Sequence, residues 1–98
     1  MKVSQPKVKK ISQGHTMEIK QMSAKAGELL PKHSANVESV LVVTQGKCNL
    51  MMNGENHALS AGESFIVPKE LKHQISVEED FKAYHIMPKE IKFEFFGE

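Results

Sequence analysis

Residues 40–68 read VLVVTQGKCNLMMNGENHALSAGESFIVP and contain short apolar runs separated by turn-forming residues. The first run, at 40–43, is uncharged and rich in β-branched residues, which is typical of a strand covered on both faces. Asn53-Gly54 is the strongest short signal for a hairpin, so residues 47–52 and 55–59 are predicted to pair as neighbouring strands. The stretch therefore predicts antiparallel strands joined by tight turns.

Alternation of apolar and polar residues continues on both sides of this stretch. Further strands are expected at residues 16–23, 64–67, 73–77, 81–87 and 91–96, with breaks at Gln45-Gly46 and at the charged residues 78–80. No 3.6-residue period appears, and turn signals recur at the spacing of about 8–12 residues that is typical of an all-β sandwich or barrel. Because 98 residues suffice for one core, we expect a flexible basic arm at 1–14 and a single domain at 15–98.

The composition argues against several classes of function. All 13 basic residues are lysine, so the chain lacks the arginine fork that recognises phosphate and guanine, and we expect no nucleic-acid partner. The longest uncharged stretch, 39–46, is too short to cross a bilayer, so no membrane partner is expected. The single cysteine, Cys48, excludes an internal disulfide, and its alternation predicts a small core residue. We expect a cytoplasmic protein.

Two groups of residues resemble the motifs of small single-domain cupins. In that family the first motif runs Gly, five residues, His-x-His, then Glu and Gly, and the second runs Gly, five residues, Pro-x-Gly, two residues, His. The residues that fit are Gly27, His33 and Gly46 in the first motif and Gly62, Pro68 and His73 in the second. The resemblance covers about residues 17–87. It implies an all-β fold, a cupin-like double-stranded β-helix, also called a jelly-roll barrel.

The resemblance also implies a metal site, because the family binds one metal ion through both His and the Glu of the first motif and the His of the second. Only His33 and His73 occupy such positions here, since Ala35 replaces the second His and Ser39 falls on the Glu position. Glu38 lies one residue away and would need a β-bulge to turn inward, because a one-residue offset reverses the facing of a side chain. We expect Glu38 to point outward, and any divalent transition metal to be weakly held. The alternative is an inward Glu38 that completes a triad with the two imidazoles.

A small pocket is expected beside His33 and His73. Its other candidate lining residues are Ala35, Ser39, Leu41, Met52 and His85. His85 faces the pocket only if Phe81 and Ala83 also face inward, and a position at the rim is the alternative that we favour. No nucleophile motif and no phosphate-binding loop is present, so no catalytic residue is predicted.

Two functions stay open at this point. The first is a non-catalytic domain that binds or senses a small molecule, its ligand not specified by the sequence. The second is a metal-dependent enzyme of dioxygenase or isomerase type that uses His33, His73 and a third ligand such as Glu38, and it rests on the resemblance alone. We also expect a homodimer, because Val40 and Val42 face away from Leu41 and Val43, so that one set needs a cover outside the barrel.

Overall fold

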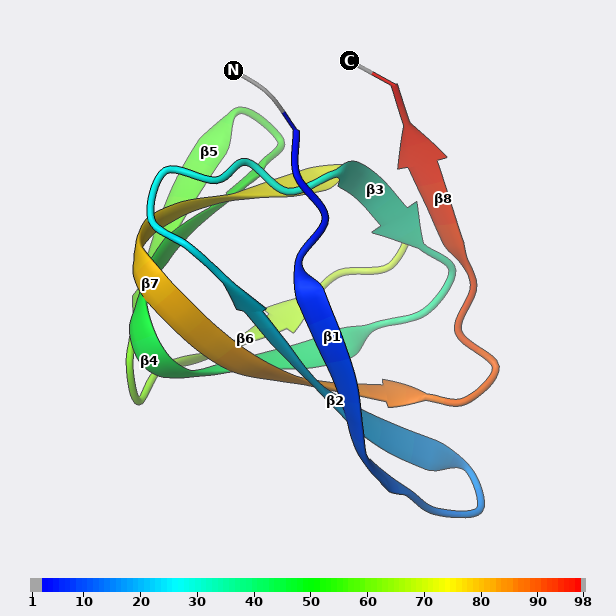
Figure 1. The fold of residues 1–98 in the computed structure, drawn as a ribbon. Helices are drawn as coiled ribbons and strands as arrows, with labels where there is room; N and C mark the ends of the chain where they lie inside the picture. Colours follow the sequence, from blue (N-terminus) through cyan, green and yellow to red (C-terminus); the bar gives the residue numbers. More distant parts are fainter. Residues whose placement is uncertain (1–2, 98) are drawn as a thin grey trace.

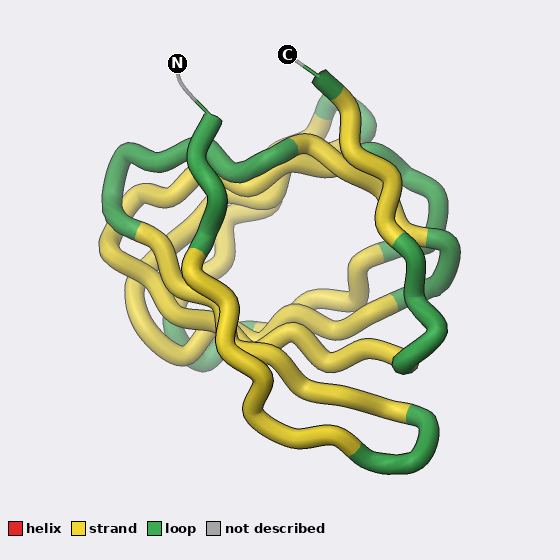
Figure 2. The backbone as a smooth tube through the Cα atoms, turned by 45° about the vertical axis from the view of Figure 1, so that its right-hand side comes forward, coloured by secondary structure: helices red, strands yellow, loops and turns green. Residues whose placement is uncertain are grey.

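The structure is a computed structural model that describes residues 3–97, and its regular elements are all strands. The strands are β1 (Lys7–Gln13), β2 (Met17–Ala24), β3 (Lys32–Ala35), β4 (Ser39–Met52), β5 (Glu55–Ser60), β6 (Ser64–Val67), β7 (His73–Pro88) and β8 (Phe93–Phe96). They wrap around a common interior (Figure 1 and Figure 2). Within residues 3–97 no helix is long and apolar enough to cross a membrane.

The strands β4 and β7 form the centre of the fold. They run antiparallel along their length, from the Val40–Ile86 pair to the Met52–His73 pair. At the Val40 end, β6 pairs with β4, while β2 and then β1 extend the sheet from β7. At the Met52 end, β5 pairs with β4, while β3 and then β8 extend it from β7. Both long strands thus belong to two curved sheets, which confirms the predicted all-β double-stranded β-helix.

Two predicted interruptions are wrong, because the strands bend there instead of ending. Gln45-Gly46 lies inside β4, and residues 78–80 lie inside β7. The register between the two strands shifts on either side of Gln45 and again after Lys47. Gly46 has a φ of 77°, and a Cβ there would overlap the carbonyl oxygen of Asp80. Glycine therefore permits a close backbone approach within a continuous pair of strands.

The segment expected to be a flexible arm contains a strand. In β1, Lys7 is opposite Ser23 and Gln13 is opposite Glu18, so the strand lies along β2. All seven residues of β1 are exposed, so no burial pattern marks it in the sequence. Backbone hydrogen bonds to β2 hold it in place without burial of its side chains. Residues 1 and 2 of the expected arm lie outside the described residues.

The predicted hairpin is present between β4 and β5. Asn53 and Gly54 have φ values of 53° and 75°, and Met52 pairs with Glu55 across the turn. Positive φ at both central residues is the requirement of a type I′ turn, which asparagine followed by glycine satisfies at least cost. This turn sets the register of β5 against β4.

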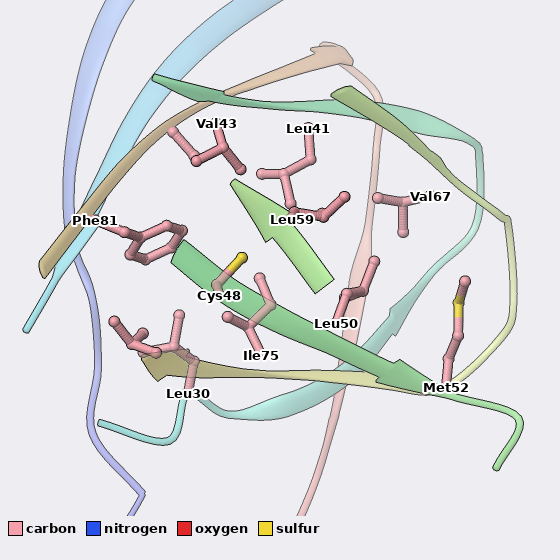
Figure 3. Packing of buried hydrophobic residues seen from close by; sticks show 12 residues of the cluster. Leu30, Leu41, Val43, Cys48, Leu50, Met52, Leu59, Val67, Ile75 and Phe81 are labelled. Carbon is pink, nitrogen blue, oxygen red and sulfur yellow. The ribbon is translucent and has the colours of Figure 1, made fainter. Parts of the chain in front are cut away.

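A cluster of buried apolar side chains fills the barrel (Figure 3). Its members are Leu30, Leu41, Val43, Cys48, Leu50, Met52, Leu59, Val67, Ile75, Val77, Phe81 and Ala83. Burial, with a smaller contribution from the negative charge of Glu78, raises the pKa of the Cys48 thiol to about 11. Cys48 is therefore the small core residue that its alternation predicted, and its thiol stays protonated at neutral pH.

Candidate ligand pocket

A pocket of about 190 Å³ opens into the barrel between the N-terminal segment and β8. Most of its lining is apolar and comes from both sheets, including Met22, Leu41, Leu50, Ile75, Met87 and Phe93. Three histidines, His33, His73 and His85, line the same pocket. A cavity of this kind excludes most water and offers only a few polar groups to orient a ligand.

His33 and His73 are brought together by strand pairing. They are directly opposite each other in the β3–β7 pair, and their ring centroids lie 4.4 Å apart in an edge-on arrangement. The Nδ1 of His33 lies 3.0 Å from the carbonyl oxygen of Pro31, and that of His73 lies 2.9 Å from the carbonyl oxygen of Leu71. A carbonyl can only accept, so each Nδ1 carries the hydrogen and donates it. Whenever such a ring is neutral, Nε2 is the acceptor that remains for a ligand.

His85 has a different environment from the other two histidines. Its Nε2 lies 2.8 Å from the hydroxyl oxygen of Ser39. Burial is the largest cause that lowers the pKa of His85, to about 4, followed by the charges of His33, His73 and Lys20. The pKa of His73 is also lowered, by burial first and by His33 to a lesser extent, while its bond to the Leu71 carbonyl opposes the shift. His85 is consequently neutral at pH 7.

Some of the sequence candidates line the pocket and others do not. His33, His73, His85 and Leu41 line it. Phe81 and Ala83 are buried, so His85 faces inward with them instead of lying at the rim that we favoured. The others, Ala35, Ser39 and Met52, are buried without lining this pocket. Ser39 lies behind His85 and acts on the pocket through its hydrogen bond.

Glu38 lies outside the pocket. It is an exposed residue in the short connection between β3 and β4. Within residues 3–97 no three His, Cys, Asp or Glu side chains are grouped so that they could hold a metal ion. The residues present therefore do not fit the four-ligand metal centre that the motif resemblance implied, and they offer two free imidazole nitrogens in its place.

Several lining residues were not among the sequence candidates. Lys20 and Met22 reach the pocket from β2, and Gln5, Pro6 and Val8 reach it from the N-terminal segment. The spacing of Lys20 and Met22 indicates that both side chains lie on the same face of β2, because residues two apart on a strand face the same side. Which side faces inward depends on the pairing of β2 with β7, which is distant in sequence.

Comparisons with known proteins agree with this fold. A cupin domain family model matches residues 20–87. A conserved protein with a double-stranded β-helix domain from Klebsiella pneumoniae is 17% identical, with 96% of this chain and 86% of that chain covered and a TM-score of 0.83. A cupin-2 domain containing protein from Shewanella frigidimarina is 22% identical, with 91% and 84% covered and a TM-score of 0.75.

A larger protein shares the fold over part of its length. A mutant of salicylate 1,2-dioxygenase from Pseudoaminobacter salicylatoxidans, in complex with gentisate, is 18% identical; 93% of this chain but 29% of that chain is covered, with a TM-score of 0.80. At such identities the solved structures establish the fold alone. No curated protein matches the sequence. The family match covers both motif regions and most of the chain, and so this chain belongs to the cupin domain family.

Proposed function

We propose that this cupin domain binds or senses a small molecule held in the pocket beside His33 and His73. The observation that carries the proposal is the pairing of these two imidazoles inside an apolar pocket from which Glu38 is excluded. The volume of about 190 Å³ exceeds the cavity of about 150 Å³ that suffices for benzene in another protein. A ligand of about one substituted ring therefore matches the space.

The two imidazoles are oriented for hydrogen bonding before a ligand arrives. The carbonyls of Pro31 and Leu71 hold the Nδ1 atoms, so neither ring must reorganise on binding. Each neutral ring presents Nε2 as an acceptor, which suits a hydroxyl or N–H donor on the ligand. Preorganisation of this kind reduces the entropy lost on binding.

A metal-dependent enzyme of dioxygenase or isomerase type is the second candidate. It is favoured by the same two Nδ1 bonds, because metal-binding histidines also donate their other ring nitrogen to a carbonyl or carboxylate. The structural similarity to salicylate 1,2-dioxygenase fits this class. Against it, a third ligand such as Glu38 would have to move from an exposed loop into the pocket.

Metal content separates the two candidates. Protein purified without an affinity tag is analysed for metals, before and after reconstitution with iron, manganese, nickel and zinc, beside Glu38→Ala. We expect metal content to be the same in both proteins, since a solvated carboxylate contributes nothing to the pocket. One metal equivalent in the wild type and none in Glu38→Ala would establish the enzyme candidate instead.

Ligand binding is tested with a thermal-shift screen of small aromatic and aliphatic compounds. Compounds that stabilise the wild type are expected to lose their effect in His33→Leu, which removes one acceptor, and to keep it in Glu38→Ala.

The cytoplasm remains our proposed compartment, because Cys48 is a free thiol.

A further inference from the structure

Lys20 places a positive charge at the pocket. It is half-buried on β2, it lines the pocket, and it is directly opposite His85 in the β2–β7 pair. Burial is the largest cause of the lowered pKa of His85, and the positive charge of Lys20 adds the smallest contribution. Among the described residues Lys20 forms no salt bridge. A partly desolvated ammonium without a counter-charge attracts an anion more strongly than a solvated one does.

The strand on the other side of Lys20 adds to the positive charge. Lys10 of β1 is directly opposite Lys20, and its Nζ lies 3.3 Å from the side-chain oxygen of Gln13. Like charges directly opposite each other across two strands destabilise the pair. An anion at this point would relieve that repulsion.

Carboxylates from this chain do not neutralise the pocket. None of its lining residues within the described part of the chain is Asp or Glu. Glu18 lies on the same face of β2 as Lys20, opposite Gln13 and Met87, but forms no salt bridge with it. On β8, Phe93 and Phe95 line the pocket, whereas Glu94 alternates to the opposite face and pairs with Ser34.

From this arrangement we infer that the ligand is a small hydroxy-substituted monocarboxylate with a compact apolar body, its carboxylate bound by Lys20. The inference rests on the proposed function and specifies its ligand class. The carboxylate belongs at Lys20 because Nε2 of His33 and of His73 are acceptors and would repel it. A hydroxyl on the ligand donates to those imidazoles, and the apolar lining takes the rest of the molecule.

The test compares carboxylates with matched neutral amides. The three isomeric hydroxybenzoates and the corresponding hydroxybenzamides are titrated by calorimetry into wild type, Lys20→Met, Lys20→Arg and Lys9→Met. Lys9 is the matched control, because it lies on β1 opposite Gln21 and therefore on the other face from Lys10. Chelator is present in one series so that a bound metal cannot account for the result.

At least one hydroxybenzoate is expected to bind the wild type about tenfold more tightly than its amide, the scale of a hydrogen bond to a charged group. The preference should vanish in Lys20→Met and persist in Lys20→Arg and Lys9→Met. Equal binding of acid and amide, a preference that survives Lys20→Met, a preference lost with chelator, or no binding by any hydroxybenzoate would overturn the inference. Failure of the proposed function is recognised separately, by a metal equivalent that Glu38→Ala loses.

Discussion

The stability of the protein should fall on mild acidification because His85 is held neutral. Its ordinary pKa of 6.5 is lowered to about 4 in the folded state, chiefly by burial. The unfolded chain then takes up a proton at His85 near pH 6.5, while the folded chain resists until about pH 4. The unfolded state binds more protons in this window, so stability is lost as the pH falls through it and levels off below pH 4.

The size of the effect follows from the two pKa values. Between about pH 7.5 and 5.0, the linkage relation gives a loss of about 2 kcal/mol from His85 alone. The lowered pKa of His73 acts in the same direction. Burial of His85 is the largest cause of the lowered pKa, followed by the charges of His33, His73 and Lys20, so the loss of stability should depend on this residue.

Urea unfolding at the two pH values measures the loss directly. The comparison is between wild type, His85→Gln and His85→Leu, with the exposed His15→Gln as the control. Each His85 variant should lose about 2 kcal/mol less than the wild type between the two pH values, whatever its stability at pH 7.5. His15→Gln should behave as the wild type. The same acid loss in the His85 variants and in the wild type would refute the assignment of a neutral His85.

Three further predictions concern the metal, the bend and the assembly. Elemental analysis should show that any bound metal is lost in His33→Ala or His73→Ala but kept in His57→Ala. The metal occupancy should decrease as the pH falls below about 6.5. Metal retained in the His33→Ala, His73→Ala double variant would place the site elsewhere. Gly46→Ala should lower the free energy of unfolding by about 2 kcal/mol or more than Gly62→Ala does, because both glycines have positive φ but only Gly46 lies against the Asp80 carbonyl. Equal urea midpoints for the two variants would contradict this. Light scattering should give about twice the 11.0 kDa chain mass, the mass of a dimer. The reason is a row of apolar side chains on the outside of the barrel, formed by Ile19, Ile86, Val40 and the 55% exposed Ile66. Ile66→Lys should shift the mass to that of one chain, and a monomeric wild type would argue against the dimer.

The fold was predictable because its signals are local. Asn53-Gly54 requires positive φ at two successive residues, and the hairpin follows from it. The motif spacing around Gly27 and Gly62 placed His33 and His73 in one barrel. The bend at Gly46 was misread as a break, because a glycine in an apolar run predicts an end and a bulge equally well.

The pocket was less predictable because it depends on contacts between distant strands. His85 and Lys20 meet through the β2–β7 pair, and no local pattern fixes which face of either strand points inward. A half-buried lysine that lines a pocket also differs from the usual full exposure of charged side chains. Glu70, which stands at the glycine of the family's Pro-x-Gly, illustrates a third limit: it has a φ of 62°, a left-handed conformation that glycine adopts more easily.

The departure at the motif's glutamate position changes the electrostatics of the pocket. The glutamate position of the motif is Ser39, whose hydroxyl hydrogen-bonds His85 instead of supplying a negative charge. Glu38 lies in the exposed loop, and Lys20 lines the pocket with no counter-charge among the described residues. A dication is repelled by such a set, whereas an anion is attracted by it. Loss of the motif's one carboxylate ligand and an inward lysine therefore act together: they weaken a metal site, and they support our proposal of a negatively charged ligand in the same barrel.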